Sequence, residues 1–150
     1  MRAAVEISQQ GIAAGQSPFG CAIWIGGDSM VAAHNRVVAD TDITAHAEIV
    51  AIRQACGRLG KISLEGAVVA ATCEPCPMCM AALHWARVDT VYYGATIGDA
   101  REAGFNELAV AAEELLRRGG SRVRLAPGPL RDECRDLFRR WKENDRRVAY

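Results

Sequence analysis

The sequence has no excess of charge of either sign, few aromatic residues and no long apolar run. Its 18 basic residues balance 18 acidic ones, and aromatic residues make up 6% of the chain. Proteins that bind single-stranded RNA use a basic groove with stacking aromatics, so a nucleic-acid partner is not expected. No run approaches the roughly 18 apolar residues of a membrane helix. Because no apolar export signal follows Met1, the sequence predicts a cytoplasmic protein without a membrane partner.

The chain does contain enough apolar material for one core. Half of its 150 residues are hydrophobic and 24% are charged, which is the composition of a soluble globular protein. No repeat, linker or low-complexity segment divides it. We therefore expect residues 1–150 to fold as a single domain.

Six cysteines are present, and their spacing separates them into two groups. Without an export signal, disulfide bonds are not expected. Cys76 and Cys79 have the spacing of metal ligands. The other four are interpreted as buried thiols, which pack like small apolar side chains: Cys21, Cys56, Cys73 and Cys134.

Hydrophobic periodicity and turn residues predict alternating helices and strands. Apolar residues at helical spacing mark the helices, and short apolar runs mark the strands. The turn Gly26-Gly27-Asp28 joins the first two strands in a hairpin. The predicted elements are helix 2–14, strands 19–25 and 30–38, helix 44–56, strand 66–72, helix 77–86, strand 88–94, helix 107–118, strand 122–125 and helix 129–145. This alternation predicts an α/β fold with a mixed five-stranded sheet and helices on both faces.

The most informative pattern is His46-Ala47-Glu48, followed further along by Pro75-Cys76-Pro77-Met78-Cys79. Zinc prefers nitrogen and sulfur ligands, and a catalytic zinc keeps one position for water. Cys76 and Cys79 share one side of a helical turn, at a helix start whose dipole favours thiolates. His46 is expected in the first turn of its own helix. Two helix starts can therefore converge on one Zn²⁺ ion per subunit, a pattern typical of zinc deaminases.

Glu48 is predicted to move protons rather than to bind the metal. Zinc lowers the pKa of its water from about 16 to roughly 7, and a nearby carboxylate can take the released proton. Glu48 would then protonate a ring nitrogen and help the amine to leave as ammonia. A structural zinc site with Cys73 as an additional ligand is the alternative. A non-enzymatic zinc-binding module would leave Glu48 without a role.

These motifs make the chain resemble the cytidine-deaminase-like zinc hydrolases over nearly its whole length. His-Ala-Glu and Pro-Cys-x-x-Cys are common to tRNA adenosine deaminases, cytosine deaminases and bacterial guanine deaminases, so they do not choose the substrate. Further segments are similar to the guanine deaminase pattern: Thr72 to Cys79, His84 to Arg87 and Asp99 to Phe105. The resemblance implies a three-layer α/β/α sandwich. It also implies a homodimer in which the swapped C-terminal segment caps the partner's site.

The resemblance assigns several residues to the face and edge of a purine. Phe19 and Trp85 would lie against the flat base. Asn35 would hydrogen-bond the base edge through its amide. From residue type alone, Phe19 also fits the core and Asn35 also fits a turn.

Glu107, Ala47 and Tyr150 complete the pocket that the resemblance implies. Glu107 aligns where the family usually has an Asp that accepts protons from the guanine amino and ring NH groups, and its side chain is one methylene longer. Ala47 is also assigned to the substrate, and Tyr150 would reach it through its ring or terminal carboxylate. By residue type, Glu107 also fits a solvated helix start, and Tyr150 a frayed terminus.

The predicted reaction is the hydrolysis of free guanine to xanthine and ammonia, a step of purine breakdown. A carboxylate such as Glu107 suits a base with donors along one edge, because analogues without them would leave the charge unpaired. The segment from Leu130 to Arg140 resembles the last helix of tRNA adenosine deaminases, which keeps A-to-I editing as the alternative. Cytosine, creatinine-like rings and triazines are further candidate substrates.

Overall fold

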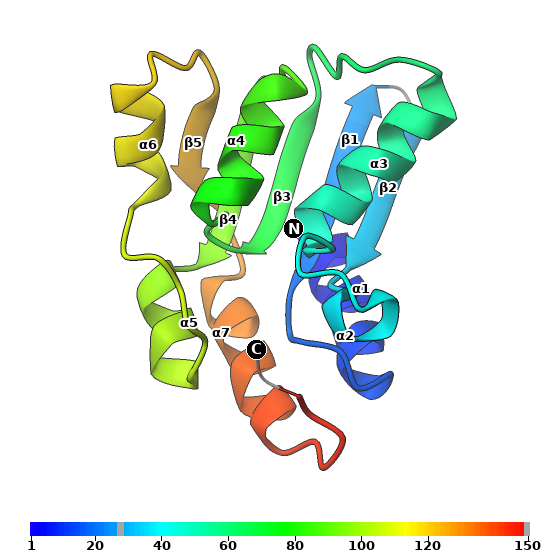
Figure 1. The fold of residues 1–150 in the computed structure, drawn as a ribbon, viewed down its shortest axis with the longest axis vertical. Coiled ribbons are helices and arrows are strands. Elements are labelled where there is room, and N and C mark those ends of the chain that lie inside the picture. Colours follow the sequence, from blue (N-terminus) through cyan, green and yellow to red (C-terminus); the bar gives the residue numbers. More distant parts are fainter. Residues whose placement is uncertain (27–28, 149–150) are drawn as a thin grey trace.

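The computed structural model describes residues 1–26 and 29–148, which form a five-stranded sheet between helices (Figure 1). The strands are β1 (Gly20–Gly26), β2 (Ser29–His34), β3 (Val68–Cys73), β4 (Thr90–Ala95) and β5 (Arg124–Pro127). Their order across the sheet is β2-β1-β3-β4-β5. β1 is antiparallel to β2 and β3, whereas β3, β4 and β5 are parallel. The mixed sheet expected from the sequence is confirmed.

Two layers of helices cover the faces of this sheet. In front of it in Figure 1 lie α3 (Ala47–Leu59), α4 (Pro77–Trp85) and α6 (Ala112–Arg118), whose apolar sides share one core cluster with the sheet. Behind it, α1 (Arg2–Ala13) and α7 (Arg131–Lys142) share a second cluster. The three-layer α/β/α sandwich is therefore confirmed. Over the described part of the chain, no helix has both the length and the apolar character needed to cross a membrane.

The two central parallel strands explain where a site can form. Val69, Ala71 and Val91 are at most 1% exposed, as expected for strands with helices on both faces. α4 crosses over between β3 and β4, a connection that is right-handed in nearly all proteins. The carboxyl ends of both strands therefore meet at one edge of the sheet, where open α/β sheets bind their ligands.

One predicted strand is shorter than its apolar run indicates. The sequence predicts a strand over 30–38, but β2 ends at His34 and one helical turn, α2 (Val37–Asp40), follows. The Oδ1 atom of Asn35 accepts a hydrogen bond from the backbone N–H of Val37 at 3.1 Å. Such a turn competes with the strand ladder and overrides the strand preference of the Val37-Val38 pair.

A short helix, α5 (Ile97–Ala103), was not predicted. It begins with a capping box, because the Thr96 hydroxyl accepts from Asp99 N–H at 3.1 Å and the Asp99 carboxylate accepts from Thr96 N–H at 2.8 Å. It ends at Gly104, whose φ of +106° costs glycine little. Thr followed three residues later by Asp is a recognisable signal, so the sequence does contain the start of this helix.

The helix predicted over 107–118 begins only at Ala112. The backbone N–H of Ala112 donates a 2.9 Å hydrogen bond to the carboxylate of Glu74. Glu74 lies between β3 and α4, far from Ala112 in the sequence. Residues 104–111 consequently form a loop. A tertiary contact sets this boundary against local helix propensity. The other predicted elements agree with the structure to within a few residues.

Candidate metal centre and substrate pocket

The three predicted metal ligands meet where α3 and α4 begin. His46 directly precedes α3, and Cys76 directly precedes α4, with Pro77 at that helix's first position. The Nδ1 atom of His46 lies 3.7 Å from the Sγ of Cys76 and 3.5 Å from the Sγ of Cys79. All three ligand atoms lie within 4.8 Å of one another. The sequence predicted His46 in the first turn of its helix, whereas the structure places it one residue earlier, as the N-cap residue.

The chemistry of these donors fits zinc. One imidazole nitrogen and two sulfurs are preferred zinc ligands, and three protein ligands are typical of catalytic sites. The hydrogen bond from the Cys79 thiol, aided by the His46 ring, outweighs burial and lowers the pKa of Cys76 to about 4. The start of α4 also favours a thiolate there. The pair thus favours a thiolate at Cys76, whereas the same hydrogen bond, followed by burial, raises the pKa of the Cys79 thiol, which must lose its proton on metal binding.

Cys73 does not join this cluster. Its Sγ donates to the carbonyl oxygen of Thr96 at 3.4 Å, and burial raises the pKa of its thiol. Within residues 1–26 and 29–148, the cluster consists of His46, Cys76 and Cys79 alone, so the four-ligand structural site is not supported. Of the cysteines interpreted as buried thiols, Cys56 is partly exposed and the other three are buried.

Glu48 lies beside the ligands in the first turn of α3. The residue is 7% exposed, and burial raises the pKa of its carboxyl although His46 opposes this. The carboxyl interacts with the Cys79 thiol, so it faces the ligand cluster. A buried carboxyl with a raised pKa can accept and return a proton closer to neutral pH than a solvated one.

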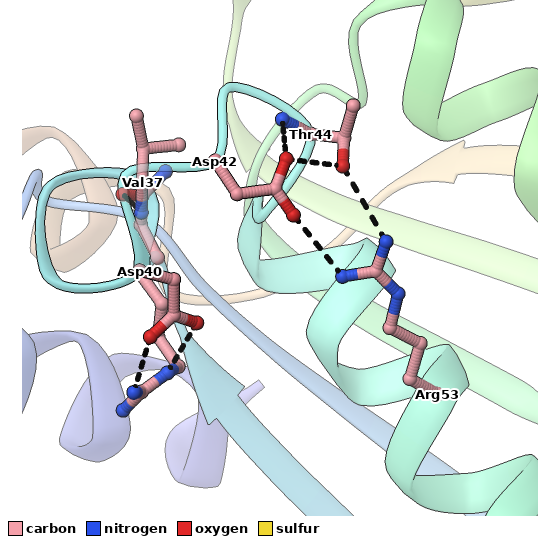
Figure 2. Close-up of polar contacts among 7 residues, drawn as sticks. Val37, Asp40, Asp42, Thr44 and Arg53 are labelled. Carbon is pink, nitrogen blue, oxygen red and sulfur yellow. Dashed lines mark hydrogen bonds and ion pairs between the residues drawn. The ribbon is translucent and has the colours of Figure 1, made fainter.

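A polar network holds the loop that leads to His46, as Figure 2 shows. The Asp42 carboxylate accepts hydrogen bonds from the backbone N–H and the hydroxyl of Thr44, at 2.8 and 2.6 Å. Arg53 on α3 reaches back to Asp42 at 3.5 Å and to Thr44 at 3.4 Å. These contacts, those of Thr44 foremost, lower the pKa of Asp42. The network ties the loop to the helix that His46 begins.

A pocket of about 320 Å³ opens beside the ligands. Small-molecule sites measure about 300–1,000 Å³, so it suits a compact ligand such as a single base. Glu107 supplies a half-buried carboxyl to its wall, and burial followed by the nearby Cys76 raises the pKa of that group. Ile43 and Leu108, which are 62% and 66% exposed, line it as well. The pocket thus combines apolar walls with one carboxyl in the same lining as His46 and Cys76.

Phe105 also lines this pocket and was not singled out from the sequence. It is 5% exposed, and its ring centroid lies 4.8 Å from that of Phe19 and 4.8 Å from that of Trp141. Phe19, which was expected against the purine, contacts the rings of Phe105 and Phe138. The sequence marks Phe105 only as the last residue of the segment from Asp99 that is similar to guanine deaminases, directly after the helix-ending Gly104, and gives it no role in the pocket.

The remaining predicted substrate residues are not all brought together. Asn35 and Ala47 are fully buried, Asn35 at the end of β2 and Ala47 at the start of α3, on the same edge of the sheet as the ligands. Trp85 lies at the opposite end of α4 from Cys76 and is 79% exposed. A single chain therefore does not bring Trp85 to the pocket. Tyr150 lies outside the described residues.

Comparison with known proteins agrees with this geometry. Residues 1–95 match the family defined by the cytidine and deoxycytidylate deaminase zinc-binding region. The guanine deaminase of Bacillus subtilis strain 168 is 41% identical over 114 residues, which are 75% of this chain and 73% of that protein. A tRNA-specific adenosine deaminase of Agrobacterium fabrum is 45% identical over 78 residues, which are 52% of this chain and 51% of that protein.

Solved structures point to the same two kinds of enzyme. A guanine deaminase from Nitrosomonas europaea has a TM-score of 0.83 at 27% identity, covering 93% of this chain and 81% of that one. A tRNA:A34 deaminase has a TM-score of 0.79 at 29% identity, covering 91% of this chain and 96% of that one. With its zinc-type ligands at the carboxyl edge of the sheet, the chain is a hydrolase of C–N bonds that belongs to the zinc-binding cytidine and deoxycytidylate deaminase family.

Proposed function

We propose that this protein hydrolyses free guanine to xanthine and ammonia. The observation that carries the proposal is Glu107, whose carboxyl lines the same pocket as His46 and Cys76. Guanine presents an amino group and a ring N–H along one edge, and a carboxylate can accept hydrogen bonds from both. The similarity to guanine deaminases from two bacteria supports this substrate.

Glu48 is proposed as the proton carrier of the reaction. Zinc, when bound, lowers the pKa of water from about 16 to roughly 7 and so supplies hydroxide near neutral pH. Glu48 accepts the proton that this water loses, delivers it to a ring nitrogen, and assists a second transfer to the amino group. A C–O bond forms and the C–N bond breaks at the same carbon. One water is therefore consumed for each ammonia released.

Substrate orientation is assigned to the residues around the pocket. Glu107 would accept the donors of guanine, Asn35 and Ala47 would contact its edge, and Phe105 would pack against the ring. Phe19 would keep Phe105 in place through their edge-to-face contact. Because Trp85 is 79% exposed in the single chain, a purine contact from it would have to cross a subunit interface.

The protein is further proposed to act as a homodimer of single-domain subunits. In this arrangement the C-terminal segment is swapped, so that Tyr150 caps the partner's pocket. Light scattering during turnover tests this assembly. A monomer that deaminates guanine at the full rate would rule out a contribution from Tyr150 of another subunit.

Editing of tRNA adenosine is the second candidate function. It is favoured by the tRNA:A34 deaminase structure, of which this chain covers 96% at a TM-score of 0.79. The balanced charge of the chain speaks against it, since RNA binding relies on basic surfaces. Ammonia release from guanine or from a tRNA stem-loop distinguishes the two functions.

The experiment incubates zinc-loaded protein with guanine, adenine, cytosine, a triazine or a tRNA anticodon stem-loop, and measures the ammonia released. We expect release from guanine and none from the stem-loop. Release from the stem-loop without release from guanine would replace the proposed function by the second candidate. Fully zinc-bound protein that acts on none of the five would indicate a different substrate class.

A further inference from the structure

We propose that Glu74 is a positioning residue that holds the substrate loop against the metal centre. The substrate loop is residues 104–111, which join α5 to α6 and carry Phe105 and Glu107. Glu74 belongs neither to the ligand cluster nor to the pocket lining. The inference rests on the proposed function and adds a residue that sets substrate affinity from outside the pocket.

The carboxylate of Glu74 bonds the main chain on both sides of the loop. Its Oε2 accepts from the N–H of Ile97 at 3.4 Å, and its Oε1 accepts from the N–H of Ala112 at 2.9 Å. Ile97 is the first residue of α5, and Ala112 is the first residue of α6. These two bonds, here called the Glu74 bridge, fix the two helices between which the substrate loop runs.

The backbone of Glu74 is anchored on the metal side. Glu74 directly follows β3 and stands two residues before the ligand Cys76. Its own N–H donates to the carbonyl oxygen of Ala95, the last residue of β4, at 2.8 Å. Pro75 and Pro77 restrict the backbone on either side of Cys76. The Glu74 bridge therefore ties the first residues of α5 and α6, between which the substrate loop runs, to the segment that carries Cys76.

The need for this bridge follows from how α6 begins. α6 has seven residues, too few for a helix to be stable without tertiary contacts. Ala111 precedes it and makes no side-chain cap, whereas α5 starts with its own capping box. Alanine is among the poorest residues at this position. The Glu74 carboxylate supplies the cap that α6 lacks, from a segment that also carries a metal ligand.

Enzyme kinetics separate positioning from a general loss of structure. We expect Glu74→Ala to raise the KM for guanine about tenfold and to change kcat by less than about threefold, because the loop that binds the base loses its support while Glu48 is untouched. Glu74→Gln should give an intermediate KM, since its amide oxygen keeps one acceptor. Glu113→Gln is the matched control, because Glu113 is an exposed carboxylate in the first turn of the same helix. It should leave KM and kcat unchanged.

Hydrogen exchange tests the bridge independently of catalysis. In Glu74→Ala, amides of residues 104–112 should exchange about tenfold faster than in the wild type, with α3 unaffected and zinc content unchanged. Glu74→Gln preserves side-chain size and provides the same measurement if the alanine variant does not fold.

Two outcomes would overturn the inference. One is an unchanged KM together with unchanged loop exchange. The other is loss of zinc without faster loop exchange, which would assign Glu74 to the ligand segment. Zinc-loaded wild type that leaves guanine intact would instead overturn the proposed function, and the exchange rates would still decide whether the bridge holds the loop.

Discussion

The metal centre and the substrate loop form two sides of one pocket but are held in different ways. His46 and Cys76 cap α3 and α4, helices whose apolar sides belong to the larger core cluster. The substrate loop is mostly exposed and depends on the Glu74 bridge and on the packing of Phe105 in the second cluster. The proposed reactive groups thus stand on helices packed in the core, whereas the residues proposed to choose the substrate stand on a loop, as is common in enzymes.

Removing a metal ligand should reduce guanine turnover more than any other change, because it acts on the metal centre and not on the substrate loop. Cys79 is fully buried and is one of the three proposed ligands. In Cys79→Ser we expect zinc binding to be lost, and guanine turnover to fall by more than the roughly 10²- to 10⁴-fold that proton transfer alone contributes. Zinc content and ammonia release measure both effects. Cys56→Ser, at a partly exposed cysteine outside the cluster, is the control. Normal turnover without zinc would refute a metal mechanism.

Glu48→Gln should separate metal binding from proton transfer. The amide has nearly the same size but cannot carry the proton, so we expect kcat to fall about 10²- to 10⁴-fold. Zinc content should remain that of the wild type, because Glu48 is not a ligand. Glu65→Gln, at an exposed carboxylate, should behave like the wild type. A fully active Glu48→Gln protein would contradict the proton-carrier role.

Glu107→Gln should affect the other side of the pocket. Losing an acceptor for the guanine donors should raise KM about 10- to 100-fold, the effect expected when a hydrogen bond to a charged group is lost. Glu107→Asp, which keeps the carboxylate but shortens the side chain by one methylene, should retain most of the affinity. Zinc content should not change in either variant. Equal KM values in all three proteins would remove Glu107 from substrate recognition.

Asp42→Asn should give the smallest effect, and that effect should depend on pH. Bonds from Thr44, and then Arg53, hold the pKa of Asp42 below its ordinary value of about 3.9. A lowered pKa stabilises the folded protein above that value, and the contribution disappears as the pH falls through the folded-state pKa. Thermal unfolding at pH 7 should therefore occur at a slightly higher temperature in the wild type than in the variant. Below about pH 4 the difference should shrink, and a difference independent of pH would exclude this origin.

The metal centre could be predicted from the sequence because its residues lie in two short segments with recognisable spacing. The spacing of Cys76 and Cys79 on one helical turn and the His46-Ala47-Glu48 segment contain nearly all of the centre. The apolar runs of β3 and β4 fixed the central strands in the same way. The sequence pattern does not bring the starts of α3 and α4 together. The crossover connections between parallel strands do so.

The substrate loop and the pocket around it could not be predicted in the same detail, because their contacts join residues that are far apart in the sequence. The start of α6 depends on Glu74, and Phe105 is held at the pocket by the rings of Phe19, which directly precedes β1, and of Trp141 on α7. No periodic pattern contains such contacts. The resemblance to guanine deaminases still placed Glu107 at the pocket, whereas Trp85 lies away from it in a single chain.

The Glu74 bridge has a consequence for how such enzymes diverge. Both of its partners are backbone N–H groups, which every amino acid except proline provides. The bridge therefore does not depend on which side chains the intervening loop carries. A loop of new sequence, grafted between residues 97 and 112, would be anchored beside the same ligands as long as neither position is proline. Selectivity for a new ring could then be inherited or engineered separately from the catalytic machinery.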